Sequence, residues 1–188
     1  MSRGSVALSR HVVLLRGVNL VRTNRVPMPK LRQVLEQAGF GDVRTYVQSG
    51  NIVLTSKASP DRVAERVRAL IQKEFGHDID VVVRSHAELV RIVKRNPLKN
   101  VATNPRRYLV TFLTGRLPRG FAAGLDTVAK QEQFAIVGSE VYSWHPDGIG
   151  RTPLWERLAS KSLGVTGTSR NWATVTTLLA MSQDQSDR

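Results

Sequence analysis

The sequence predicts an α+β fold of two tandem ferredoxin-like modules, each an antiparallel sheet with helices packed on one face. Three observations indicate this fold. β-prone runs and helical periodicity alternate as strand–helix–strand–strand–helix–strand in the first half, which is the ferredoxin-like order. The second half shows strand–helix–strand–strand–helix, and each half contains a hairpin around a Ser-Gly or Gly-Ser pair. Merger of the modules into one larger α+β globule is the alternative.

The first strand is expected at residues 11–18, a continuous apolar run interrupted by Arg16. A helix follows from Pro29, with apolar residues at helical spacing, and Gly39 is its expected stop. Two β-prone runs at 43–47 and 52–55 then flank Ser49-Gly50-Asn51. Gly and Asn accept positive φ at low cost, so this stretch predicts a tight hairpin turn.

The next segments carry clear signals for helix boundaries. Ser59-Pro60 combines an N-cap residue with a proline at the first helical position, and Gly76 ends the predicted helix. A strand is expected at 79–83. Ser85-His86-Ala87-Glu88 matches a capping box that opens a helix ending before Asn96-Pro97.

In the second half we expect a strand at 107–114, a short helix at 121–129 and a hairpin of 134–137 with 140–144. Thr152-Pro153 opens another helix, and a final helix begins near Asn171. It is expected to bury Trp172, Val175, Leu178 and Leu179. The expected organisation is a flexible leader (1–10), an N-terminal module (11–96), a linker (97–106), a C-terminal module (107–181) and a flexible tail (182–188).

Positive charge is the strongest global feature of the chain. There are 28 basic and 15 acidic residues among 188, a net charge of +13. Residues 1–96 hold 17 basic and 8 acidic residues (net +9), and the remainder holds 11 and 7 (net +4). Such a surface attracts phosphates and nucleic acid. An arginine-rich composition imposed by a GC-rich genome is an equally good explanation.

Several classes of function are disfavoured. The chain has no Cys, which excludes disulfides and thiolate chemistry and fits an intracellular protein. No apolar run is long enough to span a membrane, and the first ten residues lack a secretory apolar region. The four histidines have no metal-ligand spacing, and no P-loop or G-x-G-x-x-G motif is present. We therefore expect a cytoplasmic protein without a metal or cofactor.

Two polar strings are candidate binding elements. Thr168-Ser169-Arg170-Asn171 precedes an apolar-periodic run, so it is expected at a helix start, where free N–H groups and the Arg170 guanidinium would bind an anion. A plain helix cap is the alternative. Arg16 interrupts an apolar strand, which indicates a cleft residue or a structural ion pair; an arginine at a strand edge that reaches solvent is the third explanation.

The hairpin turn supplies further hydrogen-bonding groups from Gln48, Ser49 and Asn51, without an obvious general base. Ser49 lies in no G-x-S-x-G elbow, so turn chemistry explains it better than nucleophilic catalysis. The predicted ligand-binding set is Arg16, Asn19, Gln48, Ser49, Asn51, Arg170 and Asn171; catalytic residues are not indicated.

Aromatic residues on the predicted strands bear on nucleic-acid binding, because ferredoxin-like sheets can stack bases on exposed rings. The chain lacks an RNP1-like string, and we expect half or more of these rings to pack under the helices. His145 is expected to be exposed on the second hairpin. The aromatic set is Tyr46, Tyr108, Phe112, Phe134, Tyr142 and Trp144.

Four strings, in this order, resemble the domain-of-unknown-function family 1697. They are Leu14–Asn19, Pro27-Met28, Arg44–Asn51 and Gly167–Val175, and the resemblance covers about residues 12–179. It implies a compact bacterial α+β protein of unassigned function and brings no catalytic residues. The chain departs from the family pattern at Leu20-Val21-Arg22, where similar proteins are often glycine-rich. It also departs before the penultimate helix, where Arg151 stands near a lysine position of similar proteins.

These observations favour a cytoplasmic anion-binding module for a phosphate-bearing or nucleic-acid ligand. One alternative is an enzyme that acts on a phosphorylated or carboxylated small molecule and uses the same residues for positioning. The other is a structural or protein-interaction module. Oligomeric state is not indicated by the sequence.

Overall fold

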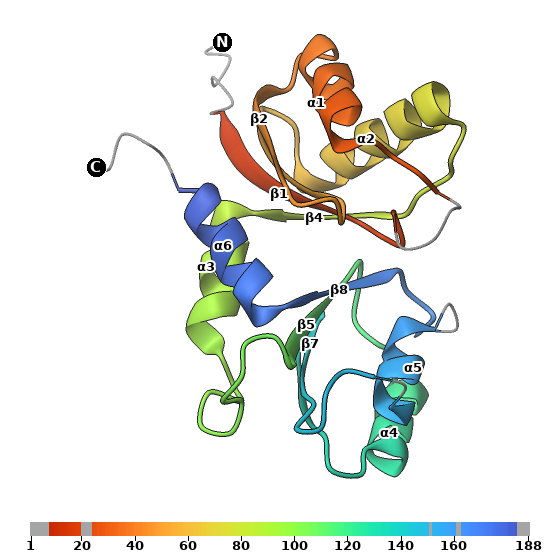
Figure 1. Ribbon diagram of the computed structural model, residues 1–188, viewed down its shortest axis with the longest axis vertical. Coiled ribbons are helices and arrows are strands. Elements are labelled where there is room, and N and C mark those ends of the chain that lie inside the picture. Colours follow the sequence, from red (N-terminus) through yellow and green to blue (C-terminus); the bar gives the residue numbers. More distant parts are fainter. Residues whose placement is uncertain (1–7, 20–23, 151, 161–162, 184–188) are drawn as a thin grey trace, which may run out of the picture. The chain divides into compact units, whose positions relative to one another are not determined.

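The computed structural model describes residues 8–19, 24–150, 152–160 and 163–183. The chain divides into two compact units, each with its own four-stranded antiparallel sheet (Figure 1). The first unit comprises residues 1–90 and 178–188, and the second comprises residues 91–177. The division therefore falls within the two helices that begin at His86 and Trp172, and not in the proline-containing segment 97–106.

The first unit has the predicted order of elements, and its sheet has the strand order β2-β3-β1-β4. Every neighbouring pair of strands in this sheet is antiparallel. This is the ferredoxin-like arrangement, so the predicted α+β class is confirmed. The elements are β1 (Ser9–Leu15), α1 (Met28–Gln37), β2 (Gly41–Tyr46), β3 (Asn51–Ser56), α2 (Pro60–Phe75) and β4 (Val81–Ser85), followed by α3 (His86–Arg95).

The core of the first unit lies between one face of its sheet and the helices α1 and α2. Successive side chains of a strand point to opposite faces, so Val13 and Leu15 of β1 share a face. They pack in one cluster with Leu31 of α1 and Val67 of α2, and all four side chains are almost fully buried. The apolar stripes predicted for both helices therefore cover the sheet.

The helix-boundary signals in this unit act as predicted. The Ser59 hydroxyl accepts a hydrogen bond from the Arg62 backbone N–H at 3.4 Å, and Gly76 ends α2 with φ +72°. Ser85 and Glu88 form the reciprocal bonds of a capping box. The Ser85 N–H donates to Glu88 Oε2 at 2.7 Å, and the Glu88 N–H donates to Ser85 Oγ at 3.3 Å.

The second unit repeats the topology of the first, with strand order β6-β7-β5-β8. Its fourth strand, β8, occupies residues that the sequence had assigned to a helix start, so that part of the prediction was wrong. β8 pairs antiparallel with β5, whereas the final helix begins at Trp172, next to Asn171, as predicted. The elements are β5 (Tyr108–Leu113), α4 (Arg119–Val128), β6 (Gln133–Val137), β7 (Glu140–Trp144), α5 (Pro153–Ala159), β8 (Gly167–Asn171) and α6 (Trp172–Met181).

Both faces of the second sheet carry buried side chains. On one face Leu113 and Val141 pack in a cluster with Leu125 of α4 and Leu158 of α5. On the other face the Tyr142 hydroxyl donates a hydrogen bond to the backbone oxygen of Ile92 in α3 at 3.0 Å. The Tyr108 ring stacks on Trp172 of α6 with centroids 4.8 Å apart. Four of the aromatic rings on the strands are buried, as expected for rings that pack under helices: Tyr108, Phe112, Tyr142 and Trp144. In α6, Trp172 and Leu179 were expected to be buried and are only partly buried.

Candidate functional site

The first hairpin turn, residues 47–50, packs tightly against the end of β1. It joins β2 to β3 and includes two residues of positive φ, Val47 at +50° and Gly50 at +71°. The Gly50 backbone oxygen accepts a hydrogen bond from the Leu15 N–H at 2.9 Å. A Cβ on Gly50 would lie 2.6 Å from Val18 Cγ2 and 2.7 Å from Leu15 Cβ, so this close approach requires glycine.

Asn19 links this turn to the loop that precedes α1. Its side-chain Nδ2 donates to the backbone oxygens of Val26, at 2.9 Å, and Gln48, at 2.7 Å. Its Oδ1 accepts from the Val26 N–H at 3.0 Å, and its own backbone has φ +56°. The amide of Asn19 is therefore used to hold two irregular backbone segments together.

Asn51 lies in β3 rather than in the turn, and its side chain is buried. Its Nδ2 donates to the Tyr46 backbone oxygen at 3.2 Å and to Ser49 Oγ at 2.9 Å. Gln48 is exposed and contributes its backbone oxygen to the bond from Asn19. The structure thus brings Asn19, Gln48, Ser49 and Asn51 together, as partners in one hydrogen-bond network around the turn.

Arg16 follows β1 directly and belongs to a charged network at the start of β4. Its Nη1 lies 3.9 Å from Asp80 Oδ2, and its side chain is 18% exposed. Asp80 also lies 3.7 Å from Arg68, whose guanidinium makes two further bonds to Asp78. The hydrogen bond from Arg68 lowers the pKa of the Asp78 carboxyl. The ion pair with Asp80 is one of the explanations that the sequence had left open.

Arg170 and Asn171 lie in the second unit, at the end of β8. Arg170 Nη1 donates to Thr168 Oγ1 and to the Ser169 backbone oxygen, both at 2.8 Å. Burial lowers the pKa of Arg170 to about 10, which still leaves it charged at neutral pH. Asn171 Oδ1 accepts from the Thr174 N–H at 2.9 Å and so caps α6. The predicted set is therefore divided, with five residues in the first unit and these two in the second.

Residues 91–107 form a strongly basic segment. The net charges of the two halves of the sequence did not reveal it. It contains six basic residues and no acidic residue, a net charge of +6. All six of these side chains are exposed, and among the residues that the structure describes no carboxylate forms an ion pair with any of them. The Arg107 guanidinium donates a hydrogen bond to the Pro146 backbone oxygen, and the other five exposed cations are Arg91, Lys94, Arg95, Lys99 and Arg106.

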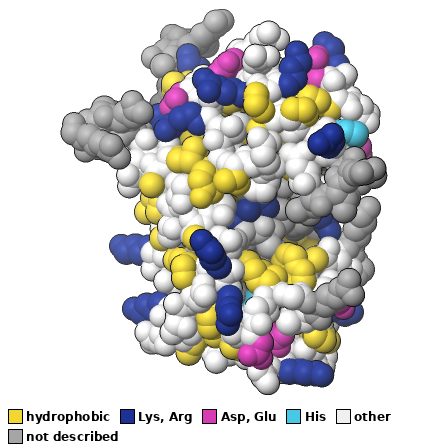
Figure 2. All heavy atoms as spheres, in the orientation of Figure 1, with side chains coloured by type: hydrophobic (Ala, Val, Ile, Leu, Met, Phe, Trp, Pro, Cys, Tyr) yellow, Lys and Arg dark blue, Asp and Glu magenta, His cyan; other side chains and the backbone are white. Residues whose placement is uncertain are grey.

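The basic segment includes the second half of α3 and the loop that follows it. Arg91, Lys94 and Arg95 recur at helical spacing on the exposed face of α3, while Ile92 is buried on the opposite face. Figure 2 shows Lys and Arg side chains projecting at the lower left edge, where Figure 1 draws the end of α3 and this loop in green.

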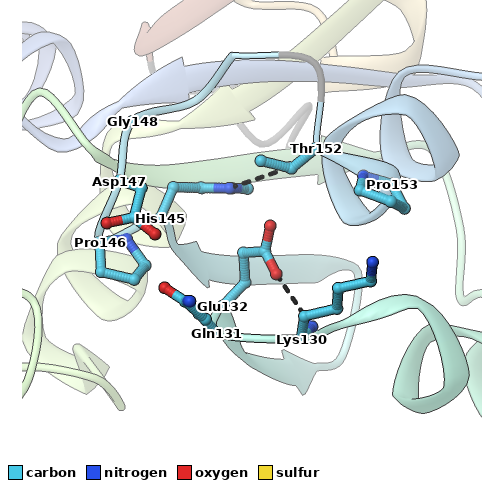
Figure 3. A pocket seen from close by; sticks show the side chains of 9 residues that line it. All are labelled: Lys130, Gln131, Glu132, His145, Pro146, Asp147, Gly148, Thr152 and Pro153. Atoms are coloured by element: carbon cyan, nitrogen blue, oxygen red, sulfur yellow. Dashed lines mark hydrogen bonds between the residues drawn. The ribbon is translucent and has the colours of Figure 1, made fainter.

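A cavity of about 280 Å³ lies within the second unit (Figure 3). Three short segments line it, 130–132, 145–148 and 152–153. His145 at its wall has no exposed surface, so the prediction of an exposed hairpin histidine was wrong. Just past the end of β7, the His145 N–H donates a hydrogen bond to the Arg107 backbone oxygen at 3.0 Å. This bond keeps His145 in the interior of the unit.

Among the residues that the structure describes, no group of three or more potential ligand side chains is arranged to hold a metal ion. Over the same residues, no helix has the length and apolarity that crossing a membrane demands. Leu20-Val21-Arg22 and Arg151, where the chain departs from the family pattern, lie outside the described residues.

The fold and these sites define a basic α+β protein of two ferredoxin-like units. The sequence profile of the family described as "Protein of unknown function (DUF1697)" matches residues 8–142, so the chain belongs to this family. None of the curated proteins matches the chain. Among solved structures, the chain is similar to the conserved bacterial protein SP0830 from Streptococcus pneumoniae. The TM-score is 0.78 and the identity 22%, with 94% of this chain and 100% of that chain covered. This likeness shows the shared fold.

Proposed function

We propose that this is a cytoplasmic protein that binds nucleic acid through the basic segment 91–107. The observation that carries the proposal is the set of exposed cations Arg91, Lys94, Arg95, Lys99 and Arg106, none of which has a carboxylate partner among the described residues. Fixed positive charges without ion pairs attract phosphates and release the counterions condensed on a nucleic acid.

The contrast with the first unit supports this choice of surface. The first unit has more basic residues, but Arg10, Arg32 and Arg62 are each paired with a carboxylate. Arg16, Arg44 and Arg68 are paired as well. An ion pair neutralises most of the local field, so these arginines have less attraction for a phosphate than the exposed cations of residues 91–107.

The buried aromatic rings favour recognition of the phosphate backbone over recognition of bases. Tyr108, Phe112 and Tyr142 on the second sheet are each no more than 2% exposed, so they offer no face on which a base could stack. We therefore expect binding with little sequence preference and a strong dependence on salt.

The test is fluorescence anisotropy with labelled single-stranded RNA, single-stranded DNA and duplex DNA over a range of salt concentrations. If most of the five cations contact phosphates, the logarithm of the affinity for a single strand should fall with the logarithm of salt at a slope of roughly −3. The triple variant Arg91→Gln, Lys94→Gln, Arg95→Gln should bind at least about tenfold more weakly with a shallower slope, because three phosphate contacts are lost.

A matched control removes the same charge elsewhere. Lys30, Lys57 and Lys73 are exposed in the first unit, so Lys30→Gln, Lys57→Gln, Lys73→Gln also lowers the net charge by three. Gln has a helix propensity close to that of Lys and Arg, so both triple variants should remain folded. Equal loss of binding in the two variants would mean that total charge, and not this segment, attracts nucleic acid. No measurable binding by the wild-type protein at low salt would overturn the proposal.

A further inference from the structure

The cavity of the second unit has a composition unlike that of the basic surface. Its nine lining residues include one ammonium group, on Lys130, and two carboxylates, on Glu132 and Asp147, so the net charge of the lining is 1 − 2 = −1. The chain as a whole has a net charge of +13. A net negative cavity in such a basic protein favours a ligand of a different class from nucleic acid.

Glu132 is the charged group best held for binding. Its side chain is half-buried, and its Oε2 accepts a hydrogen bond from the Lys130 N–H at 3.0 Å. Burial opposes the charged carboxylate, but hydrogen bonds from the Lys130 and Glu132 backbone and from the Thr152 side chain outweigh burial and lower its pKa. Figure 3 shows the carboxylate directed toward His145 and Thr152. It is an anion held in place before a ligand arrives.

His145 contributes an uncharged wall. Its Nε2 lies 3.0 Å from Ser143 Oγ, and its Nδ1 lies 3.5 Å from Thr152 Oγ1. Burial lowers its pKa, although the nearby Glu132 carboxylate partly offsets this, so the ring is neutral at pH 7. The ring therefore does not neutralise Glu132. A carboxylate has about four acceptor positions, so one that receives three internal donors can still accept another.

We propose that this cavity binds a small organic molecule with a positively charged nitrogen group, an amine or a guanidinium, that donates to the Glu132 carboxylate. The uncharged part of such a molecule would lie against the rings of Pro146 and Pro153, which also line the cavity. The volume of about 280 Å³ is near the lower end of ligand pockets, which limits the ligand to roughly the size of an amino acid. This site is independent of the nucleic-acid surface proposed above.

The test compares three probes of nearly equal shape: benzylamine, benzyl alcohol and benzoate. Titration of the ¹⁵N-labelled full-length protein is followed by the backbone amide resonances of residues 130–132 and of His145, Asp147 and Gly148. Benzylamine should shift these resonances in a saturable way, while benzyl alcohol and benzoate should have little effect. If benzoate shifts them as strongly, Lys130 determines the site and the proposal of a cation site is overturned. No response to any of the three probes also overturns it.

A variant with its control identifies the group responsible. Glu132→Gln keeps the size and an acceptor oxygen but removes the charge, and it should weaken benzylamine binding about tenfold or more. Asp126→Asn removes one negative charge from an exposed position on α4 outside the cavity and should leave binding unchanged. Equal binding by wild type and a folded Glu132→Gln protein would overturn the role of Glu132. If that variant does not fold, the comparison of the three probes on the wild-type protein still decides the proposal.

Discussion

Asn19 shows how a short amide side chain stabilises backbone that lies outside regular secondary structure. Its three side-chain bonds all go to backbone atoms of Val26 and Gln48. The sequence could identify Asn19 and Asn51 as polar groups near strand ends, but it could not show whether their amides point into a cleft or back at the chain. That choice depends on contacts between segments far apart in sequence, such as residue 19 with residue 48.

Gly50 supports a prediction about the first hairpin turn. Gly50→Ala should lower the free energy of unfolding by roughly 2–4 kcal/mol, because it combines a left-handed backbone with overlap against buried atoms. Leu15 and Val18, which the new methyl group would meet, are each no more than 2% exposed. Urea unfolding of the variant and the wild type measures the difference.

Gly39→Ala is the matched control for Gly50→Ala. Gly39 also has positive φ, +87°, but an added Cβ would meet no atom within 4 Å. Its cost should be limited to the backbone term, about 1 kcal/mol. Similar losses of stability in the two variants would show that backbone conformation alone, and not packing against β1, requires glycine at position 50.

At the scale of elements, the sequence predicted best those segments whose signals are local. Ser59-Pro60, Gly76 and the Ser85–Glu88 box all mark helix ends in the structure. β8 was missed because Gly167–Asn171 has little β propensity of its own, being Gly-Thr-Ser-Arg-Asn. It is a strand because it pairs with the fully buried β5, where Thr111 Oγ1 and Ser169 Oγ lie 2.7 Å apart. Such tertiary pairing leaves no signal in the segment itself.

The capping box gives a prediction at this scale, because it fixes the start of α3. Ser85→Ala removes the hydroxyl that accepts from the Glu88 N–H and donates to Glu88 Oε2 at 2.8 Å. The variant should lose about 1–2 kcal/mol of stability in chemical denaturation. Ser59→Ala, which loses a single bond of 3.4 Å at the start of α2, should cost less. If the two serine variants cost the same, the reciprocal bonds of the box add nothing to a simple cap.

For the whole molecule, the sequence gives the total charge, but it does not show which basic side chains form ion pairs with carboxylates. Residues 1–96 have the larger net charge, but the exposed cations without carboxylate partners in residues 91–107 extend across that division, with Arg91, Lys94 and Arg95 before it and Lys99 and Arg106 after it. Ion pairs such as Arg68 with Asp78 depend on how a helix and the following loop fold back on each other. The cavity in the second unit was likewise invisible, because residues 130–132, 145–148 and 152–153 meet only in the folded chain.

Two buried histidines, one in each unit, should make the stability of the whole protein sensitive to acid. His11 is 1% exposed and His145 is fully buried. Burial lowers the pKa of both rings. For His11 the backbone of Ser56 and Ala58 and then the Glu88 carboxylate offset this only in part, and for His145 the Glu132 carboxylate does so. In the unfolded chain both rings gain a proton near their ordinary pKa of 6.5. Below that pH the unfolded state binds more protons than the folded state, so stability falls as the pH falls.

We therefore expect the free energy of unfolding to be nearly constant above pH 7 and to decrease between pH 6.5 and 5, by up to about 1.4 kcal/mol per pH unit for each histidine. Asp78 and Glu132 also have lowered pKa values, but their ordinary values of 3.8 and 4.5 place most of their effect at lower pH. Urea unfolding at pH 7 and pH 5 measures the loss.

The double variant His11→Gln, His145→Gln should lose much less stability between pH 7 and pH 5, whatever its stability at pH 7. The control His77→Gln, at a partly exposed position, should behave like the wild type. An equal loss in the wild type and the double variant would show that other groups cause the acid sensitivity.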